Sequence, residues 1–598
     1  MPDDKDQQSK VEDFQKLQIL AHEAEKQAEV RFRQKLLNIY AESAQDKERV
    51  AKNWDNYIAF LRGRQWPTRR PSHKVSALLN FMIENVERKT ALLTDTKPIP
   101  KVSPRSDKLQ DTADILNTLL SMIFESSSYT QARADIVENC QVMGSGFSGT
   151  LYNSDIDAGR GGIEVVSYDP RAVYIDPLVR KSYLLAEGEY VILEDIWSLE
   201  KARDMFPKRA DMYQASAGLS RYGLAKKGGF LSGLRSRIFS STQQQTKLSE
   251  VPRVYVREFY LRDRQKKDDS TQYRFNKASR RVVMIGDVIA DDGSNPYNDG
   301  EFPIDMIAWH TDFDTAWGWG DVELLKSPQE LINKITATII ENIALMSNAI
   351  WIGDQDALPK EEWNRLNNAP GSYVKKHPGR ELRREPGVPL PAYVGQTVNS
   401  LELASEKMTG MVNVMQGIST GQVASGVGIE SLQLMAQALI RLRARAQESM
   451  QERIGRKLIS RIFQYYEPDK IFEVLKESEE QTSKTETIVA LTSELLKPVA
   501  RRKKEYWTDI AFKIEPGSSL GLAKTQRRVE SMRLFELKAI DDEALLNDIE
   551  YPNRTKVLKR MDEKREAEGA AELAQNGQSG SAVSQFPHQA GASPQGRF

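Results

Sequence analysis

The chain contains a single cysteine, Cys140, among its 598 residues. One thiol cannot form a disulfide within the chain, and it cannot supply a metal site built from several thiolates. The 5 histidines are also sparse, and none stands in the H-E-x-x-H spacing of a helical metal site. These absences argue against a disulfide-stapled secreted domain and a zinc enzyme, and they fit a reducing compartment.

Long apolar runs and an excess of charge of one sign are missing too. No stretch reaches the roughly 18 apolar residues that a membrane-spanning helix requires. Lysine plus arginine and aspartate plus glutamate both number 84, so the formal net charge is zero. This balance does not fit a protein that grips nucleic acid tightly by neutralising phosphates, but it fits one past which DNA slides.

Two glycine-containing motifs resemble enzyme signatures. Gly144–Gly149 matches G-x-G-x-x-G, but a dinucleotide site needs that loop between a strand and a helix, and here we expect a helix-to-strand turn. Gly517–Gly521 matches the G-x-S-x-G nucleophile elbow around Ser519, in a fitting strand–turn–helix context. The only later histidine, His588, lies in a polar tail, so a serine hydrolase is the weaker alternative to a turn whose serine caps a helix.

Two further ligand-binding signatures fail on inspection. Asp291–Gly300 has the composition of a calcium loop, but Pro296 stands where an EF-hand requires glycine, so we expect a hairpin turn without metal. No G-x-x-x-x-G-K-[ST] phosphate loop occurs, so the chain is not itself an ATPase motor. The sequence therefore predicts a non-enzymatic protein that needs no cofactor.

Residues 326–466 carry the most informative pattern, a succession of helical stripes. Ser327–Glu330 opens the first stripe with a capping box and a proline at the first helical position. A second stripe follows at nearly the spacing of a coiled-coil seam. We expect both stripes to be buried against neighbouring copies of the chain. This stem seam consists of Leu331, Ile335, Ile339, Ile343, Val398, Leu401, Met408, Met411 and Met415.

A third amphipathic pattern runs from about Ser431 to Tyr466, where Pro468 prevents continuation. At about 1.5 Å per residue, such a helix would be roughly 50 Å long, and it would also fit a coiled-coil scaffold without a channel. Its basic residues would contact phosphates or an acidic partner, or form a solvated face or ion pairs between subunits. They are Arg441, Arg443, Arg445, Arg453, Arg456, Lys457 and Arg461.

The remainder of the chain predicts an α+β fold that is mostly helical. Residues 1–49 indicate a charged helix of low amphipathicity, exposed or packed on a neighbouring subunit, and residues 215–248 indicate a loop. Strand-like segments are 147–153, 162–168, 172–176, 187–196, 254–261, 272–275, 281–289, 303–310, 471–476 and 506–514.

Three pieces of the sequence occur in an order that resembles a known family. The first is Trp54–Trp66, followed by Asn80 and Pro98, and the second runs from Tyr168–Pro170 to Tyr174–Pro177. The third is Trp317–Asp321 leading into Gln329–Asn333, with Ser425–Ile429 ahead of the long helix. Together they resemble the portal proteins of tailed bacteriophages, of the short-tailed type.

The resemblance implies a dodecameric ring at one capsid vertex of the virion, assembled in the host bacterial cytoplasm, through which double-stranded DNA is packaged and ejected. It implies the terminase large subunit, a neck or tail adaptor, and the major capsid and scaffold proteins as partners, and no membrane. The implied parts are a charged N-terminal helix (1–49), an α+β wing (50–325), stem helix 1 (326–349), a small mixed clip (350–395), stem helix 2 (396–416), a tunnel loop (417–430), the long wing helix with wing return strands (431–516), a helical crown (517–566) and a disordered tail (567–598).

Two of these parts are candidate sites. The tunnel loop is uncharged and rich in glycine, so it can touch a moving duplex without trapping it electrostatically. The clip carries a basic cluster that would contact DNA, dock the motor or adaptor, or form ion pairs between subunits. The DNA-facing loop residues are Gly417, Ser419, Thr420, Gly421, Gln422, Ser425, Gly426 and Gly428, and the clip basic cluster is Lys375, Lys376, Arg380, Arg383 and Arg384.

Overall fold

The computed structural model combines helices with small antiparallel sheets, as the α+β prediction requires. Within the part of the chain that the structure describes, no helix has the length and apolarity to cross a membrane. The described residues are 3–66, 71, 74–106, 109–216, 251–267, 272–347, 350–365, 374–385, 389–410, 438–479, 494–502, 506–515, 521–549, 557–558, 560–561 and 564. The tunnel loop, Ser519 and the tail from residue 567 lie outside this set.

Five helices precede the first large sheet. The last of them begins where the Ser126 hydroxyl accepts a hydrogen bond from the Tyr129 N–H, and it ends at Gly144, whose φ is +84°. A strand begins at Ser145, so the predicted helix-to-strand turn is made at Gly144 alone, and the rest of the motif to Gly149 lies in the strand. The helices are α1 (Asp3–Ala51), α2 (Trp54–Leu61), α3 (Phe81–Thr94), α4 (Gln110–Glu125) and α5 (Ser127–Met143).

Two antiparallel sheets form the centre of the body. The smaller has the order β3-β2-β9 and the larger β4-β5-β6-β7-β8. The segment 281–289, predicted as one strand, contains the β7–β8 hairpin, because Gly286 supplies the positive φ of the turn. The strands are β2 (Ser145–Asn153), β3 (Gly162–Tyr168), β4 (Val173–Ile175), β5 (Tyr190–Ser198), β6 (Arg253–Arg262), β7 (Ser279–Ile285), β8 (Val288–Ser294) and β9 (Ile304–Ala308), with helix α6 (Leu199–Met205) after β5.

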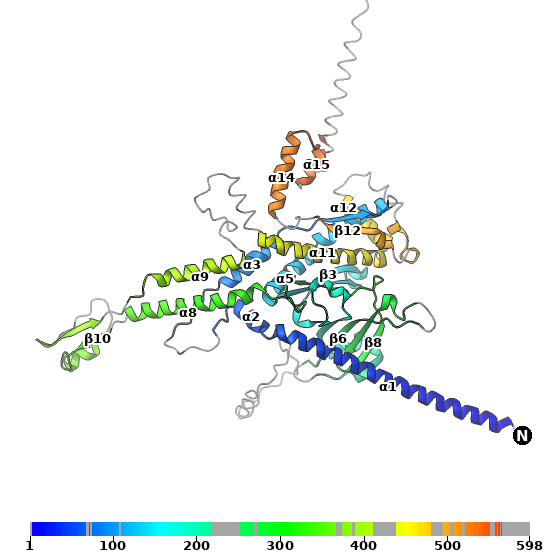
Figure 1. Cartoon of the computed structure of the whole chain (residues 1–598), viewed down its shortest axis with the longest axis horizontal. Helices are drawn as coiled ribbons and strands as arrows, with labels where there is room; N and C mark the ends of the chain where they lie inside the picture. The colour runs from blue at the N-terminus through cyan, green and yellow to red at the C-terminus, as the bar shows by residue number, and fades with distance from the viewer. Residues whose placement is uncertain are drawn as a thin grey trace, which may run out of the picture.

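Helix α1 covers one face of the five-stranded sheet (Figure 1). Leu36 is fully buried there against Ile192 and Phe259, and the Lys47 ammonium donates to the backbone oxygen of Val173 at 2.8 Å. The C-terminal half of this helix therefore packs on its own chain, whereas residues 22–31 are exposed. The expectation of an exposed or neighbour-bound helix holds for that outer part alone.

The opposite face of the larger sheet meets the smaller sheet through an aromatic core. Trp317 lies at its centre, with ring centroids 5.7 Å from Trp54 and 5.5 Å from Phe147. Beside it, the backbones of Gly144 and Gly318 approach so closely that a Cβ on Gly144 would lie 2.1 Å from the Gly318 oxygen. The glycines and tryptophans of the Trp317–Asp321 motif are thus packing requirements.

The third region is built on the long helix α11 (Ala438–Tyr465), which packs against α4, β1 (Pro100–Pro104) and β12 (Ile510–Ile514). This helix ends one residue short of the predicted Tyr466. Segment 471–476 was predicted as a strand, and this prediction is wrong. It belongs to helix α12 (Pro468–Glu479), because a proline that cannot continue one helix is well suited to the first position of the next.

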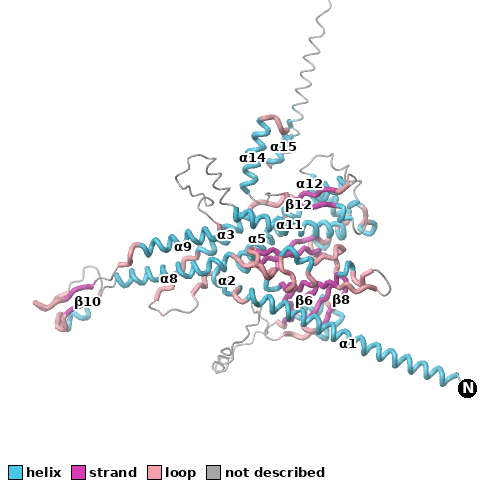
Figure 2. The backbone as a smooth tube through the Cα atoms, viewed as in Figure 1, coloured by secondary structure: helices cyan, strands magenta, loops and turns pink. Residues whose placement is uncertain are grey.

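Helices α8 (Asp321–Ser347) and α9 (Tyr393–Thr409) project from the body side by side, and we call this pair the arm (Figure 1). The hairpin of β10 (Ile350–Gly353) and β11 (Leu382–Glu385) lies at its tip (Figure 2). The first arm helix begins at Asp321, earlier than the predicted 326. The prediction that Ser327–Glu330 opens the helix is therefore wrong, and Pro328 lies inside the helix. Helices α14 (Gly521–Glu536) and α15 (Asp542–Asp548) pack on each other elsewhere on the body.

Candidate functional site

The arm presents apolar side chains to solvent along both helices. Of the predicted stem seam, Leu331, Ile343 and Met408 are exposed, with 45%, 56% and 46% of their surfaces accessible. Ile335, Ile339, Val398 and Leu401 are half-buried, and Met411 and Met415 lie outside the described residues. Contact between the two arm helices therefore covers only part of the seam. A row of exposed apolar side chains on a projecting element is typical of an interaction surface.

A network of side-chain amides fixes the base of the arm to the body. The Gln329 side chain accepts from the Phe81 N–H at 3.2 Å and donates to Asn333 at 3.1 Å. The Asn333 amide donates to Gln65, which in turn donates to Asn80 at 3.0 Å. Because buried amides must all be paired, this network specifies one position of α8 against α2 and α3.

A buried charge cluster adjoins that network at the first residue of α8. The Lys89 ammonium of α3 lies 2.5 Å from Asp321 Oδ2, and His310 Nε2 lies 3.0 Å from Oδ1 of the same carboxylate. Arg443 of α11 closes the chain of contacts, with Nη2 2.5 Å from His310 Nδ1 and a second hydrogen bond to the Trp309 carbonyl. The cluster thus joins α3, the base of the arm and the long helix.

The hydrogen bonds of the cluster fix the tautomer of His310. Arginine can only donate, so Nδ1 of His310 must accept, and Nε2 must carry the proton that is donated to Asp321. The imidazole stacks on the Trp319 ring at 4.0 Å, which holds it in this orientation. His310 is therefore a neutral bridge between a carboxylate and a guanidinium.

Electrostatics keep Asp321 ionised at neutral pH. Burial alone would raise its pKa, but the hydrogen bond from His310 and the positive charge of Lys89 outweigh that effect and lower the pKa to about 2. Burial lowers the pKa of Lys89, an effect that Asp321 opposes. The pair has the character of a structural lock, because both side chains are almost fully buried, with 5% and 2% of their surfaces exposed.

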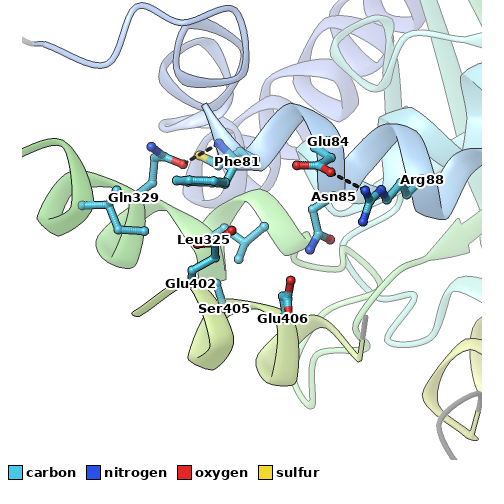
Figure 3. Close-up of a pocket in the computed structure, with 11 residues that line it drawn as sticks. Phe81, Glu84, Asn85, Arg88, Leu325, Gln329, Glu402, Ser405 and Glu406 are labelled. Carbon is cyan, nitrogen blue, oxygen red and sulfur yellow. Dashed lines mark hydrogen bonds and ion pairs between the residues drawn. The ribbon is translucent and has the colours of Figure 1, made fainter. Parts of the chain in front are cut away.

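A small acidic cleft of about 100 Å³ lies between α3, α8 and α9 (Figure 3). Glu84 faces it and pairs with Arg88 at 2.5 Å, while Glu402 and Glu406 line its far side. Burial raises the pKa of Glu402, and the neighbouring Glu406 and Glu84 raise it further. The cleft is too small and too acidic to hold a DNA phosphate.

The basic residues of the long helix mostly face inward, contrary to both predicted alternatives. Lys457 and Arg461 are buried, with 2% and 0% of their surfaces exposed. Lys457 pairs with Asp305 at 2.8 Å, Arg453 pairs with the same carboxylate at 3.4 Å, and Arg461 pairs with Asp299. They attach α11 to β9 and the loop before it, so they are unavailable to DNA or a neighbour. Among the seven basic residues predicted to line this helix, only Arg445 and Arg456 are exposed.

The clip basic cluster is brought together at the tip of the arm. Arg383 and Arg384 lie on β11, opposite Ile352 and Trp351 of β10, and the other three residues lie in the segment leading into that strand. All five are exposed, and Arg383 pairs with Glu385 at 3.3 Å. Lys376 donates to the Arg380 carbonyl at 3.2 Å. The result is a basic, solvent-facing hairpin.

The remaining motifs do not form reactive sites among the residues that the structure describes. Asp291–Gly300 is not the predicted hairpin turn, because it continues β8 and then leads into β9, with Asp292 and Asp291 paired to Arg280 and Arg281. No group of acidic, histidine or cysteine residues in the described set could hold a metal ion. The eight tunnel-loop residues and Ser519 fall outside that set.

Sequence reasoning missed the residues that lock the arm to the body. One signal was available: Lys89 stands in register with Met82, Val86 and Leu93, and those four residues are the buried ones of α3. A charged residue within a buried stripe indicates a partner. His310 and Asp321 offered no comparable pattern, since their contacts come from elements distant in the sequence.

Comparison with known proteins agrees with the features above. A comparison with curated proteins finds no match. The model of the family described as "Phage P22-like portal protein" matches residues 39–595, which include both sheets, the arm and the long helix. A family match over most of the chain, together with a projecting helical arm and a basic tip, is decisive for its assignment. The chain belongs to the phage P22-like portal protein family.

Proposed function

We propose that twelve copies of the chain form a ring whose channel is surrounded by the arms. Membership of the family means a non-enzymatic portal at the capsid vertex that serves DNA packaging, and in general terms an oligomeric ring that meets DNA and terminase. The observation that carries the finer proposal is the row of exposed apolar residues on the arm. Leu345 and Leu403 extend it, with 68% and 45% of their surfaces exposed. Adjacent arms would bury these rows against each other.

The parts of the subunit follow from this arrangement. The body formed by the two sheets would be the wing, the arm helices α8 and α9 the two stem helices, and the β10–β11 hairpin the clip. Residues 417–430, between α9 and α11, would be the tunnel loop, and α14 with α15 would belong to the crown. The amide network and the Lys89–Asp321 cluster support this assignment, since both would set the angle between stem and wing.

The clip basic cluster would be the docking surface for the terminase large subunit and afterwards for a neck or tail adaptor. Five exposed cations on one hairpin would attract acidic surfaces over roughly 8–10 Å at moderate ionic strength. Capsid and scaffold proteins would meet the wing. Charge reversal at Lys375 and Arg380 should weaken terminase capture by assembled rings while the rings remain intact, and equal capture would count against this surface.

The decisive experiment is negative-stain electron microscopy of the purified chain. We expect rings with a central hole, and a filled rod would instead indicate a scaffold without a channel. Ile340 of α8 also belongs to the exposed rows, with 39% of its surface exposed. Ile340→Asp and Leu403→Asp place charge in these rows and should yield monomers in sedimentation velocity. Ser400→Asp, on the same helix as Leu403, is the matched control and should still give rings. A stable monomer of the unaltered chain at high concentration and low ionic strength would refute the ring.

A further inference from the structure

A cavity of about 630 Å³ lies where the two sheets diverge, apart from the arm and its charge cluster. Its walls come from both sheets, from the loop before β9 and from the end of α11. Cavities of this size are typical of sites for small molecules or for short segments of another chain. The cavity is open to solvent on one side, and the portal role does not account for it, so its lining is informative.

Polar residues occupy the inner sheet face where a core would be expected. On β6, Phe259 and Leu261 point toward α1 and are buried among apolar neighbours, so Glu258 and Tyr260 point the other way, into the cavity. On β5, Asp195 takes the same inner face. Aliphatic side chains could fill the space between the two sheets at little cost in free energy. The charged groups found here instead leave a cavity that can make polar contacts.

Aromatic rings form the walls of the cavity. Tyr152 and Tyr465 stack with centroids 4.1 Å apart and planes inclined by 5°, which makes one flat wall. Trp197 and Tyr168 contribute others. Beside the cavity, the Arg461 guanidinium lies 3.9 Å from the centre of the Tyr297 ring, so the protein already holds one cation against this aromatic cluster.

The charges that face the cavity are mostly negative. Glu258 pairs with Arg281 at 2.7 Å, but Asp195 accepts only from neutral donors, the Ile196 N–H and Trp197 Nε1, each at 2.7 Å. Asp195 is exposed to solvent at the mouth of the cavity, so its carboxylate is hydrated and can pair with a cationic ligand. Burial raises the pKa of the Tyr168 hydroxyl, and the carboxylates of Glu258 and Asp195 raise it further, as a negative potential requires.

We propose that this cavity binds an organic cation, an alkylammonium or guanidinium group on a flexible chain. Ring faces attract such cations, and Asp195 would supply the ionic contact. Anionic ligands such as phosphates would be repelled, since Arg281 is the only cation among the lining residues and is already paired. The volume exceeds that of one side chain, so a linear polyamine or a run of basic residues in a peptide would fill it better than a single ammonium group.

Isothermal titration of assembled, full-length protein tests the site. The probes are spermidine, a short lysine–arginine peptide, and 1,8-octanediol as a neutral chain of similar length. We expect at least one cationic probe to bind, and Asp195→Asn to weaken that binding about tenfold. The Asn side chain still accepts from Trp197, so the fold should be kept. Asp287→Asn, in the exposed β7–β8 turn, is the matched control and should leave the dissociation constant unchanged.

The possible results distinguish the two sources of the cation, and some of them would refute the proposal. Binding of spermidine without the peptide identifies a free amine as the ligand, and the reverse identifies a basic protein segment. Equal binding of the diol, or an unchanged dissociation constant for Asp195→Asn, overturns the proposal. If Asp195→Asn does not fold, the test is crosslinking of the unaltered protein with a photoreactive polyamine. Crosslinks at Tyr168 or Trp197 support the site, and crosslinks found only elsewhere overturn it.

Discussion

Lys89 and Asp321 form a buried ion pair that joins α3 to the first residue of the arm, with Nζ 2.5 Å from Oδ2. His310 and Arg443 extend it to the long helix. In the proposed ring, a load on the arm would therefore pass directly to α11. Both side chains are almost fully buried, with 5% and 2% of their surfaces exposed, so water cannot replace either partner.

Removing one partner of this pair should strongly destabilise the chain. Lys89→Met leaves the Asp321 carboxylate buried without its cationic partner, and loss of a buried partner costs about 3–5 kcal/mol. Urea denaturation followed by circular dichroism measures the change in the free energy of unfolding. Lys97→Met is the control, because Lys97 pairs with Glu125 at 3.9 Å on the surface and should contribute less than about 1 kcal/mol. Similar losses in the two variants would show that the buried pair has no special role.

Acid should release the same lock. The pKa of Asp321 is lowered from 3.8 to about 2, so its ionisation stabilises the fold at all pH values above about 4. That stabilisation, about 2 kcal/mol, is lost as the pH falls from 4 through 2. Urea midpoints measured between pH 6 and pH 2 should fall more steeply for the unaltered chain than for Asp321→Asn. If the urea midpoints of the two proteins fell equally with pH, the lowered pKa of Asp321 would be contradicted.

Two glycines with similar positive φ should respond very differently to alanine. Gly144 and Gly159 have φ of +84° and +89°, so alanine costs about 1 kcal/mol in backbone strain at either position. At Gly159 nothing lies within 4 Å of the added Cβ, whereas at Gly144 the Gly318 oxygen lies 2.1 Å away. Gly144→Ala should therefore lose about 2 kcal/mol more than Gly159→Ala, as overpacking does. Thermal unfolding compares the two, and equal melting temperatures would show that the backbones separate easily.

Local periodicity predicted much of the fold. The arm helices, the end of the long helix and most strands of both sheets were predicted because each follows from spacing within a few residues. The helix-to-strand turn was also predicted, although it is confined to Gly144, because glycine at the end of a helix has a local cause.

Partners distant in the sequence could not be predicted. Pairing of β1 with β12 joins residues near 100 and 512, and no local pattern encodes it. Arg461 was expected in solvent or between subunits, because charge normally avoids the core. It is buried since Asp299 and the Thr150 carbonyl meet it from two other elements. Segment 471–476 was predicted as a strand because it has too few apolar residues to distinguish the spacing of a helix from that of a strand.

The tunnel loop remains a prediction from sequence, since it lies outside the described residues. If it contacts moving DNA, its glycines allow the backbone to change conformation as the duplex passes. Gly421→Pro with Gly426→Pro would fix φ near −65° at both positions and remove two N–H donors. We expect rings to assemble normally, since the arm rows are unchanged, and we expect packaged DNA per particle to fall. Alanine at the same positions keeps the N–H donors and is the matched control. Quantification of DNA in purified particles measures the effect, and full genome content in the proline variant would mean that the loop has no part in packaging or retention.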